Sequence, residues 1–324
     1  MIRFILLLVL GAASLLPAAG ALAQTWPARP VRLIVPLAAG STADIVSRTI
    51  GEELARALGQ PVVIDNKPGA GGSIAMAEVA RAAPDGYTIA FASQGTQVFN
   101  MALYSKPGYD SLKDFAPIAL TGGVSNVMIV HPSDPATSVQ DVIVRAKAKP
   151  GELTFSSGGA GTSHHMSGVL FGMKTDVKIQ HVPYKGAPQG IQAVMGAEVI
   201  MGFFNTPTVL GQIRGGKLKA LAVTSEARSG LLPDVPTMIE SGVKDYVVNT
   251  WTGFIAPRET PPDVVERLNR ELNRISGLPA VRDKLLAQGI ELFPPQPATA
   301  LDQLTRGDLA LWVPIIKASG ATAD

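Results

Sequence analysis

The sequence contains no cysteine. Disulfide bonds, cysteine-ligated metal sites and cysteine nucleophiles are therefore excluded, and a large apolar core must stabilise the fold instead. Long apolar runs are also scarce. Beyond residues 4–16, no stretch of that length lacks proline, glycine or charge, so a spanning helix is not expected after the N-terminus.

The chain also lacks an excess of charge of either sign. Its 28 basic and 26 acidic residues become 27 and 26 when Arg3 is removed, a net charge of +1, and no basic run is present. This balance argues against nucleic acid as a partner. About 300 residues remain after the N-terminal segment, a length that suggests two domains.

The N-terminal segment has the pattern of a secretory signal peptide. Arg3 is followed by the apolar run Phe4–Leu16, and Ala21-Leu22-Ala23 forms the small-x-small pattern of a cleavage site. We predict a signal peptide at residues 1–23, cleavage after Ala23 and a periplasmic mature protein. The alternative is a membrane anchor, but the run is shorter than the ~20 residues that a spanning helix needs.

The motifs of several enzyme classes are missing. Neither Ser163 nor Ser41 lies in a G-x-S-x-G elbow, and Gly159-Ala-Gly161 is followed by a histidine where a dinucleotide fingerprint needs glycine. Gly216-Lys217 precedes leucine, so no Walker loop is present. Adjacent histidines point in different directions on a helix, which makes His164 and His165 a poor metal pair. We therefore predict no catalytic residue, no cofactor and no metal.

Short β-branched runs alternate with helical patterns along the chain, which predicts an α/β fold with mostly parallel sheets flanked by helices. Expected strands include 31–36, 61–64, 87–92, 117–121, 127–130, 177–181, 199–204, 220–224 and 251–256. Expected helices include 74–82, 138–147, 190–195, 209–215, 262–276, 279–288 and 299–316.

Ligands of open α/β sheets bind beyond the carboxyl ends of the strands. Polar loops containing small residues follow four strand ends, at 37–44, 92–97, 156–165 and 204–207. We therefore predict two lobes with the ligand between them.

The segment 154–168 has the composition of an anion-binding loop. It has glycines at 158, 159 and 161, hydroxyls that include Ser157, Thr162 and Ser163, and no acidic residue before Lys174. Exposed backbone N–H groups and the dipole of the following helix favour a carboxylate or a small oxyanion. The alternative is an ordinary strand-to-helix turn with Ser163 as its N-cap.

Other polar residues follow strands and could contact the same ligand. Lys185 could pair with a carboxylate or lie on a solvated surface, and both interpretations stay open. Asn205 and Thr206 can offer polar contacts at another strand end. Asp44 is interpreted as a cap or a loop brace rather than as an acid catalyst.

The mature chain resembles the solute-binding receptors of tripartite tricarboxylate transporters, also called Bug proteins. Each shared motif is short, but their order and number make the resemblance specific. The motifs span residues 36–44, 66–72, 84–88, 161–164, 182–186, 216–224, 235–237 and 256–261.

This resemblance implies a two-lobed periplasmic binding protein of the type II, Venus-flytrap kind. Such a receptor passes a carboxylate-bearing small molecule to membrane permease subunits, and we expect it to be a monomer. Carried onto this chain, the family's binding loops nominate residues from both lobes: Gly40, Ser41, Thr42, Gly95 and Thr96 in the first, and Gly161, Thr162, Ser163, His164, Lys185 and Asn205 in the second.

Two departures from the family pattern leave the ligand's identity open. Ser41 stands where a second glycine is usual, and His165 stands where leucine is usual. If His164 or His165 contacts the ligand as a cation, affinity should fall as the pH rises through about 6–7. Dicarboxylates, tricarboxylates, acidic amino acids and aromatic acids all remain candidates.

We predict that residues 24–125 and 249–324 form lobe 1 and that residues 126–248 form lobe 2. One alternative function is a periplasmic enzyme that acts on a carboxylate through Ser163 and His164. Another is a sensory binding module for a signalling partner.

Overall fold

The computed structural model describes residues 26–323, so the predicted signal peptide and its cleavage site after Ala23 lie outside the described residues. Strands and helices alternate along most of this length. The strands are β1 (Val31–Val35), β2 (Val62–Asn66), β3 (Thr88–Ser93), β4 (Phe115–Val130), β5 (Thr154–Ser157), β6 (Gln180–Pro183), β7 (Met201–Asn205), β8 (Lys219–Val223), β9 (Asn249–Pro257) and β10 (Glu291–Leu292).

The longer helices are α2 (Thr42–Leu58), α3 (Ser73–Ala80), α5 (Val139–Ala148), α6 (Ser163–Thr175), α7 (Ala187–Met195), α8 (Thr206–Arg214), α9 (Pro262–Ser276), α10 (Pro279–Leu286) and α11 (Thr299–Ser319). Two short helical segments follow β3: η2 (Gly95–Phe99), a π-helical turn, and α4 (Asn100–Leu103). The sequence predicted only a loop after residue 92, so the helical start at Gly95 was missed.

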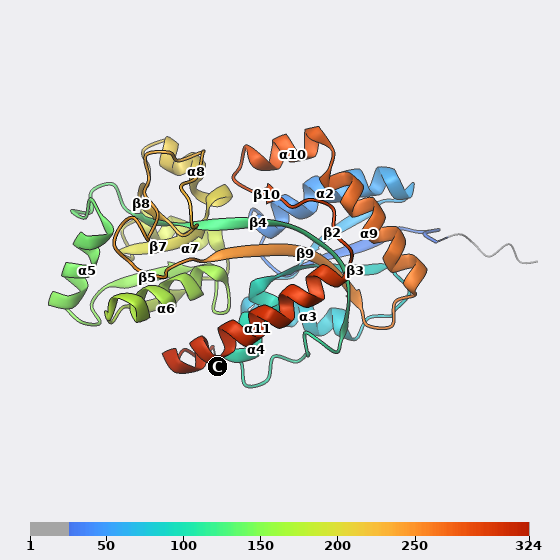
Figure 1. Cartoon of the computed structure of the whole chain (residues 1–324), viewed down its shortest axis with the longest axis horizontal. Coiled ribbons are helices and arrows are strands. Elements are labelled where there is room, and N and C mark those ends of the chain that lie inside the picture. The colour runs from blue at the N-terminus through green and yellow to red at the C-terminus, as the bar shows by residue number, and fades with distance from the viewer. Residues whose placement is uncertain (1–25, 324) are drawn as a thin grey trace, which may run out of the picture.

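The elements form two lobes, with β4 and β9 running side by side between them (Figure 1). In lobe 1 the strand order is β2–β1–β3–β9–β4, and in lobe 2 it is β4–β7–β5–β6, with β8 on the other edge of β4. Strands β1–β3 are parallel, and so are β5–β7. The predicted two-lobed α/β fold is confirmed.

Strand β4 is continuous over 16 residues, although the sequence predicted separate strands at 117–121 and 127–130. It pairs antiparallel with β9 as far as Ser125 and with β7 from Asn126 onward. Both sheets are therefore mixed. Strand β9 pairs antiparallel with β3 and β4, and β4 pairs antiparallel with β7 and β8. Gly122 lies in the gap between the two predicted strands and permits close packing: a Cβ there would lie 2.4 Å from the backbone oxygen of Glu291.

Helix α2 shows how local sequence places a helix start at the junction of the lobes. The Ser41 hydroxyl caps the first turn by accepting a hydrogen bond from the Asp44 N–H, at 3.4 Å. Apolar residues at helical spacing, including Ile50 and Leu54, are fully buried against the sheet. Gly59 ends the helix in a left-handed conformation, with φ 68°.

Helices cover both faces of each sheet. Buried residues of α2 and α9 pack on one face of the lobe 1 sheet, and those of α3 and α11 pack on the other. In lobe 2, α7 and α8 cover one face and α5 and α6 the other. Within residues 26–323, no helix combines the length and the apolar character that crossing a membrane requires.

Candidate ligand-binding site

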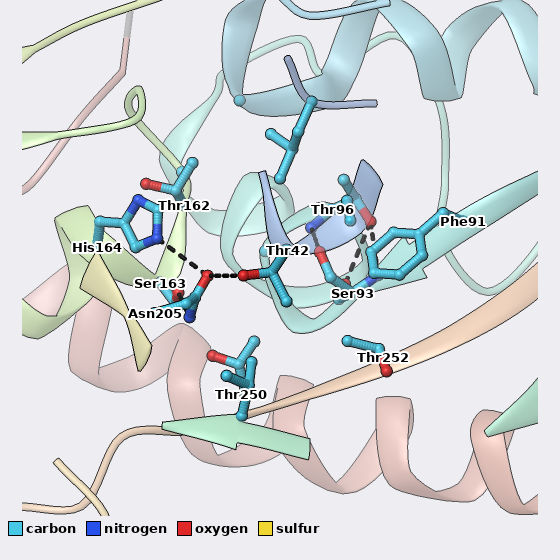
Figure 2. Close-up of a pocket in the computed structure, with 16 residues that line it drawn as sticks. Thr42, Phe91, Ser93, Thr96, Thr162, Ser163, His164, Asn205, Thr250 and Thr252 are labelled. Carbon is cyan, nitrogen blue, oxygen red and sulfur yellow. Dashed lines mark hydrogen bonds between the residues drawn. The ribbon is translucent and has the colours of Figure 1, made fainter. Parts of the chain in front are cut away.

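An interior cavity of about 40 Å³ lies where the lobes meet, and residues of both lobes line it (Figure 2). The lining comes from the carboxyl ends of strands, from the helix starts that follow them and from the crossing strands β4 and β9. It consists of Leu37, Thr42, Ala43, Gly71, Phe91, Ser93, Gly95, Thr96, Val124, Gly161, Thr162, Ser163, His164, Asn205, Thr250 and Thr252.

Three helices begin at this cavity. Thr42 is the first residue of α2, Ser163 is the first residue of α6, and Asn205 immediately precedes α8. The π-helical turn η2 also begins there, at Gly95. Because the first turn of a helix has unpaired N–H groups and a partial positive charge, helix starts from both lobes point electropositive backbone at one small space.

The start of α6 differs from the prediction in one residue. Thr162, not Ser163, is the N-cap, because its hydroxyl accepts a hydrogen bond from the His165 N–H at 3.4 Å. Helix α6 therefore begins at Ser163 and includes both histidines. Among the described residues, no acceptor is recorded for the backbone N–H of Ser163 or His164, so these two donors remain available for a ligand.

The cavity lining contains no Asp, Glu, Lys or Arg. The nearby Asp44 lies outside the lining, where its carboxylate accepts hydrogen bonds from the Gly40 N–H and from Arg48. Burial alone would raise the pKa of Asp44, but hydrogen bonds from Arg48, Gly40 and Asn66 hold it below its usual value. This agrees with the predicted role of Asp44 as a loop brace.

A buried network of amides joins the site to strands β4 and β7. Asn205 Oδ1 accepts hydrogen bonds from Thr42 Oγ1 at 3.2 Å and from His164 Nε2 at 3.1 Å (Figure 2). Asn205 Nδ2 donates to Asn126 Oδ1, and Asn126 Nδ2 donates to the Ser163 carbonyl. The Thr42–Asn205 bond links lobe 1 directly to lobe 2.

His164 is held as a neutral imidazole. Its Nδ1 accepts a hydrogen bond from the Gly158 N–H, so the proton lies on Nε2. Burial lowers its pKa to about 4, although the bond to Asn205 opposes this shift. His164 is therefore uncharged near pH 7 in this structure, and it offers a ligand no positive charge.

His165 is neutral for a similar reason and faces away from the cavity. Its ring stacks on His181 with 3.9 Å between the centroids, and Phe155 also stacks on His181, with 4.9 Å between the centroids. Burial lowers the pKa of His165 to about 4, and burial together with the His165 ring lowers that of His181 to about 3. The His165 Nδ1 accepts from the Gly161 N–H at 3.4 Å, which braces the loop behind the cavity.

Several predicted residues line the cavity and others do not. Those in the lining are Thr42, Gly95, Thr96, Gly161, Thr162, Ser163, His164 and Asn205. Ser41 instead caps α2, the Ser157 hydroxyl bonds His181 Nε2 at 2.7 Å, and Thr206 donates to the Ser125 carbonyl. Gly40 and Asp44 brace the loop before α2. Their direct contact with a ligand stays a prediction.

Lys185 lies at a larger opening next to the cavity. This opening, of about 500 Å³, shares Leu37 and Gly71 with the inner cavity and also includes Tyr104 and Tyr184. Lys185 is exposed there, and no ion pair of its side chain is present within residues 26–323. Among residues 26–323, it is the only Lys or Arg that borders either the cavity or this opening.

Sequence reasoning missed the contribution of the crossing strands. Val124 of β4 pairs with Thr250 of β9, and both side chains line the cavity together with Thr252. Gly71 was noticed only as part of a family motif. The alternation of Thr250 and Thr252 around Trp251 signals a strand face, but the sequence does not show what this face meets.

Glycines allow the lobes to approach closely around the cavity. A Cβ on Gly95 in lobe 1 would lie 2.9 Å from the backbone oxygen of Gly161 in lobe 2. A Cβ on Gly71 would lie 2.2 Å from the oxygen of Ala160. Both distances are shorter than a normal contact, so this arrangement of the lobes depends on glycine at these positions.

Comparison with known proteins identifies the family. Residues 46–321 match the family model described as the tripartite tricarboxylate transporter family receptor. The chain belongs to this receptor family. BugT of Bordetella pertussis is 35% identical over 304 residues, a match that covers 92% of each chain. Members of the family are periplasmic solute-binding receptors and not enzymes, which confirms the resemblance drawn from the sequence.

Solved structures of receptors from this family have the same fold. The periplasmic binding protein BugD is 33% identical, with a TM-score of 0.87 over 92% of this chain and 99% of its own. An R. palustris protein solved with adipate is 33% identical, with a TM-score of 0.88 over 92% of this chain and 99% of its own. MatC from Rhodopseudomonas palustris, with bound malate, is 31% identical, with a TM-score of 0.86 over 90% of this chain and 100% of its own.

Proposed function

We propose that this protein is a periplasmic receptor that binds a carboxylate-bearing small molecule between its lobes and delivers it to a tripartite tricarboxylate-type permease. The convergence of helix starts from both lobes on an interior cavity without acidic residues carries this proposal. The adipate and malate found in two related receptors support a carboxylate as the ligand.

Backbone donors are strong enough to hold a carboxylate without an arginine. A hydrogen bond to a charged group contributes about 1.5–3 kcal/mol. About four to six such bonds, reduced by the costs of ordering and association, can reach the ~8 kcal/mol of a micromolar complex. The free N–H groups at Ser163 and His164 and the starts of α2 and η2 can supply these bonds.

We further propose that the chain divides between the lobes at residues 125/126 and 248/249. At the first position, β4 exchanges β9 for β7 as its partner, and Ser125 pairs with Asn249. A hinge at these paired positions lets the lobes rotate as units. The ligand then favours the closed form because it touches both lobes only there.

A thermal-shift screen tests ligand binding. The mature protein is unfolded, refolded to remove any co-purified ligand, and then screened against mono-, di- and tricarboxylates, acidic amino acids and aromatic acids. An acid at a hundred times its dissociation constant should stabilise the fold by about 2.7 kcal/mol, a shift of several degrees. If no carboxylate shifts the melting temperature of the refolded protein, the receptor proposal is wrong.

Delivery to a permease needs a test in cells. Deleting the gene for this chain should abolish high-affinity uptake of the acid identified in the screen. A plasmid copy should restore uptake, whereas a copy carrying a binding-deficient substitution should not. Unchanged uptake in the deletion strain would contradict the delivery role while leaving binding intact.

A further inference from the structure

One of the hydroxyl groups that line the cavity differs from the others because it has no hydrogen-bond partner within the described residues. Six of the seven have a hydrogen-bond partner within the described residues. They belong to Thr42, Ser93, Thr96, Thr162, Ser163 and Thr252. The seventh, Thr250 Oγ1, has none, although Thr250 is only 7% exposed.

A buried hydroxyl without a partner is unfavourable, so its retention in a binding cavity needs an explanation. Thr250, labelled in Figure 2, lies on β9, whereas Ser163 and Thr42, which are expected to hold the carboxylate, lie at the starts of α6 and α2. Thr250 is directly opposite Val124 in the strand register, and both residues line the cavity.

The surrounding side chains limit what can bind to this hydroxyl. The cavity has no acidic residue to neutralise an ammonium group and no basic residue to neutralise a second carboxylate. Phe91 and Val124 provide apolar surface in the lining of the same cavity, which suits methylene groups. A neutral polar substituent on an otherwise aliphatic acid fits this environment better than a charged one.

We propose that Thr250 is a specificity-determining residue whose hydroxyl forms a hydrogen bond with a hydroxyl group on the carbon chain of the ligand. The preferred ligands are then hydroxy acids rather than the corresponding unsubstituted acids or amino acids. This inference rests on the proposed carboxylate-receptor function and narrows its ligand class.

The test uses acids that differ by a single hydroxyl group: malate and succinate, 2-hydroxyglutarate and glutarate, and lactate and propionate. Dissociation constants are measured by calorimetry with the refolded protein. We expect the wild type to bind the hydroxylated member of at least one pair about tenfold more tightly, as one neutral hydrogen bond allows.

Thr250→Val keeps the branched shape and removes only the hydroxyl. In this variant the ratio of the dissociation constants of the unsubstituted acid and the hydroxy acid should fall to about one. The main reason is that the hydroxy acid binds less tightly, while the unsubstituted acid binds as before. The melting temperature without ligand should not decrease, since no protein hydrogen bond is lost. Ser276→Ala is the matched control, because Ser276 Oγ is also buried and unpaired but lies outside the cavity lining. It should retain the preference.

Thr250 also borders a second opening beside α11, of about 190 Å³, together with Gln94 and Asp308. A water molecule bound there could satisfy the hydroxyl instead. That arrangement predicts equal affinity within every pair that binds, or a preference that Thr250→Val leaves intact. Either result would overturn the role of Thr250 while the receptor function stands. Failure of every acid in the panel and in the wider screen to bind would instead overturn the receptor function itself.

Discussion

Closure of the lobes can be blocked at a single glycine. Gly95 lies in lobe 1 at the start of η2, and its backbone is not in the left-handed region. Gly95→Ala therefore introduces no backbone strain and retains the N–H group. Its Cβ would, however, lie 2.9 Å from the Gly161 oxygen in lobe 2, so the lobes would have to separate by several tenths of an ångström.

The expected size of the effect follows from this overlap. Forcing one extra methyl group into a packed interface costs about 1–3 kcal/mol, which weakens ligand binding about 5- to 150-fold. The open form does not carry this penalty. Because alanine is favoured over glycine in helical segments by up to about 1 kcal/mol, the melting temperature without ligand should stay level or rise.

Calorimetry and small-angle scattering can measure both parts of this prediction, with the acid identified by the thermal screen. The variant should bind more weakly and contract less on adding ligand. Gly307→Ala is the control, since a Cβ there meets nothing within 4 Å. Gly186→Ala is a second, independent test, because its Cβ would lie 2.8 Å from Ala38 Cβ. If Gly95→Ala and Gly186→Ala both bind with wild-type affinity and contract fully on adding ligand, the predicted block of closure is wrong.

Three further predictions concern the anion loop, the amide network and pH. Thr162→Asp keeps an oxygen at the N-cap but adds a negative charge, so calorimetry should show at least about tenfold weaker carboxylate binding without unfolding; unchanged affinity would remove this loop from the site. Asn126→Ala should destabilise the fold by about 2–4 kcal/mol in urea titrations, because it removes the buried hydrogen bonds that the Asn126 amide makes with Asn205 Nδ2, the Ser163 carbonyl and Ser167 Oγ; a loss below 1 kcal/mol would contradict that role. Stability should decrease as the pH falls from about 6.5 toward 4, because the unfolded chain takes up protons that buried His164 and His165, with pKa values of about 4, do not. His165→Leu should make the free energy of unfolding depend less steeply on pH in this range. Carboxylate affinity should stay constant between pH 6.5 and 8, and a steep change in affinity there would mean that an imidazole binds as a cation.

The helix starts at the site were accessible from the sequence because their signals are local. A strand, a loop of small polar residues and an amphipathic helix occur together around Thr42 and Ser163. Since carboxyl ends of parallel strands meet at one edge of a sheet, the convergence of these loops could be predicted without coordinates. Exact caps were harder, because Thr162 and Ser163 are adjacent and both belong to the residue types preferred at the N-cap.

The role of β4 and β9 could not be predicted because it depends on distant pairing. Thr250 lines the cavity only because β9 lies beside β4, where residue 250 meets residue 124. The break predicted near Gly122 has the same origin, since the space that this glycine leaves is filled by β10. Neither neighbour is visible in a local window of sequence.

The position of β9 also determines the order in which the receptor can assemble. This strand separates β3 from β4, and it pairs Ala90 with Ile255, residues that are far apart in the sequence. Contacts of such long range close large loops and slow folding. Until residues 249–257 are in place, β1–β3 and β4 remain two unconnected pieces of sheet. We therefore expect the contiguous segment 126–248 to fold first and the insertion of β9 to be the rate-limiting step.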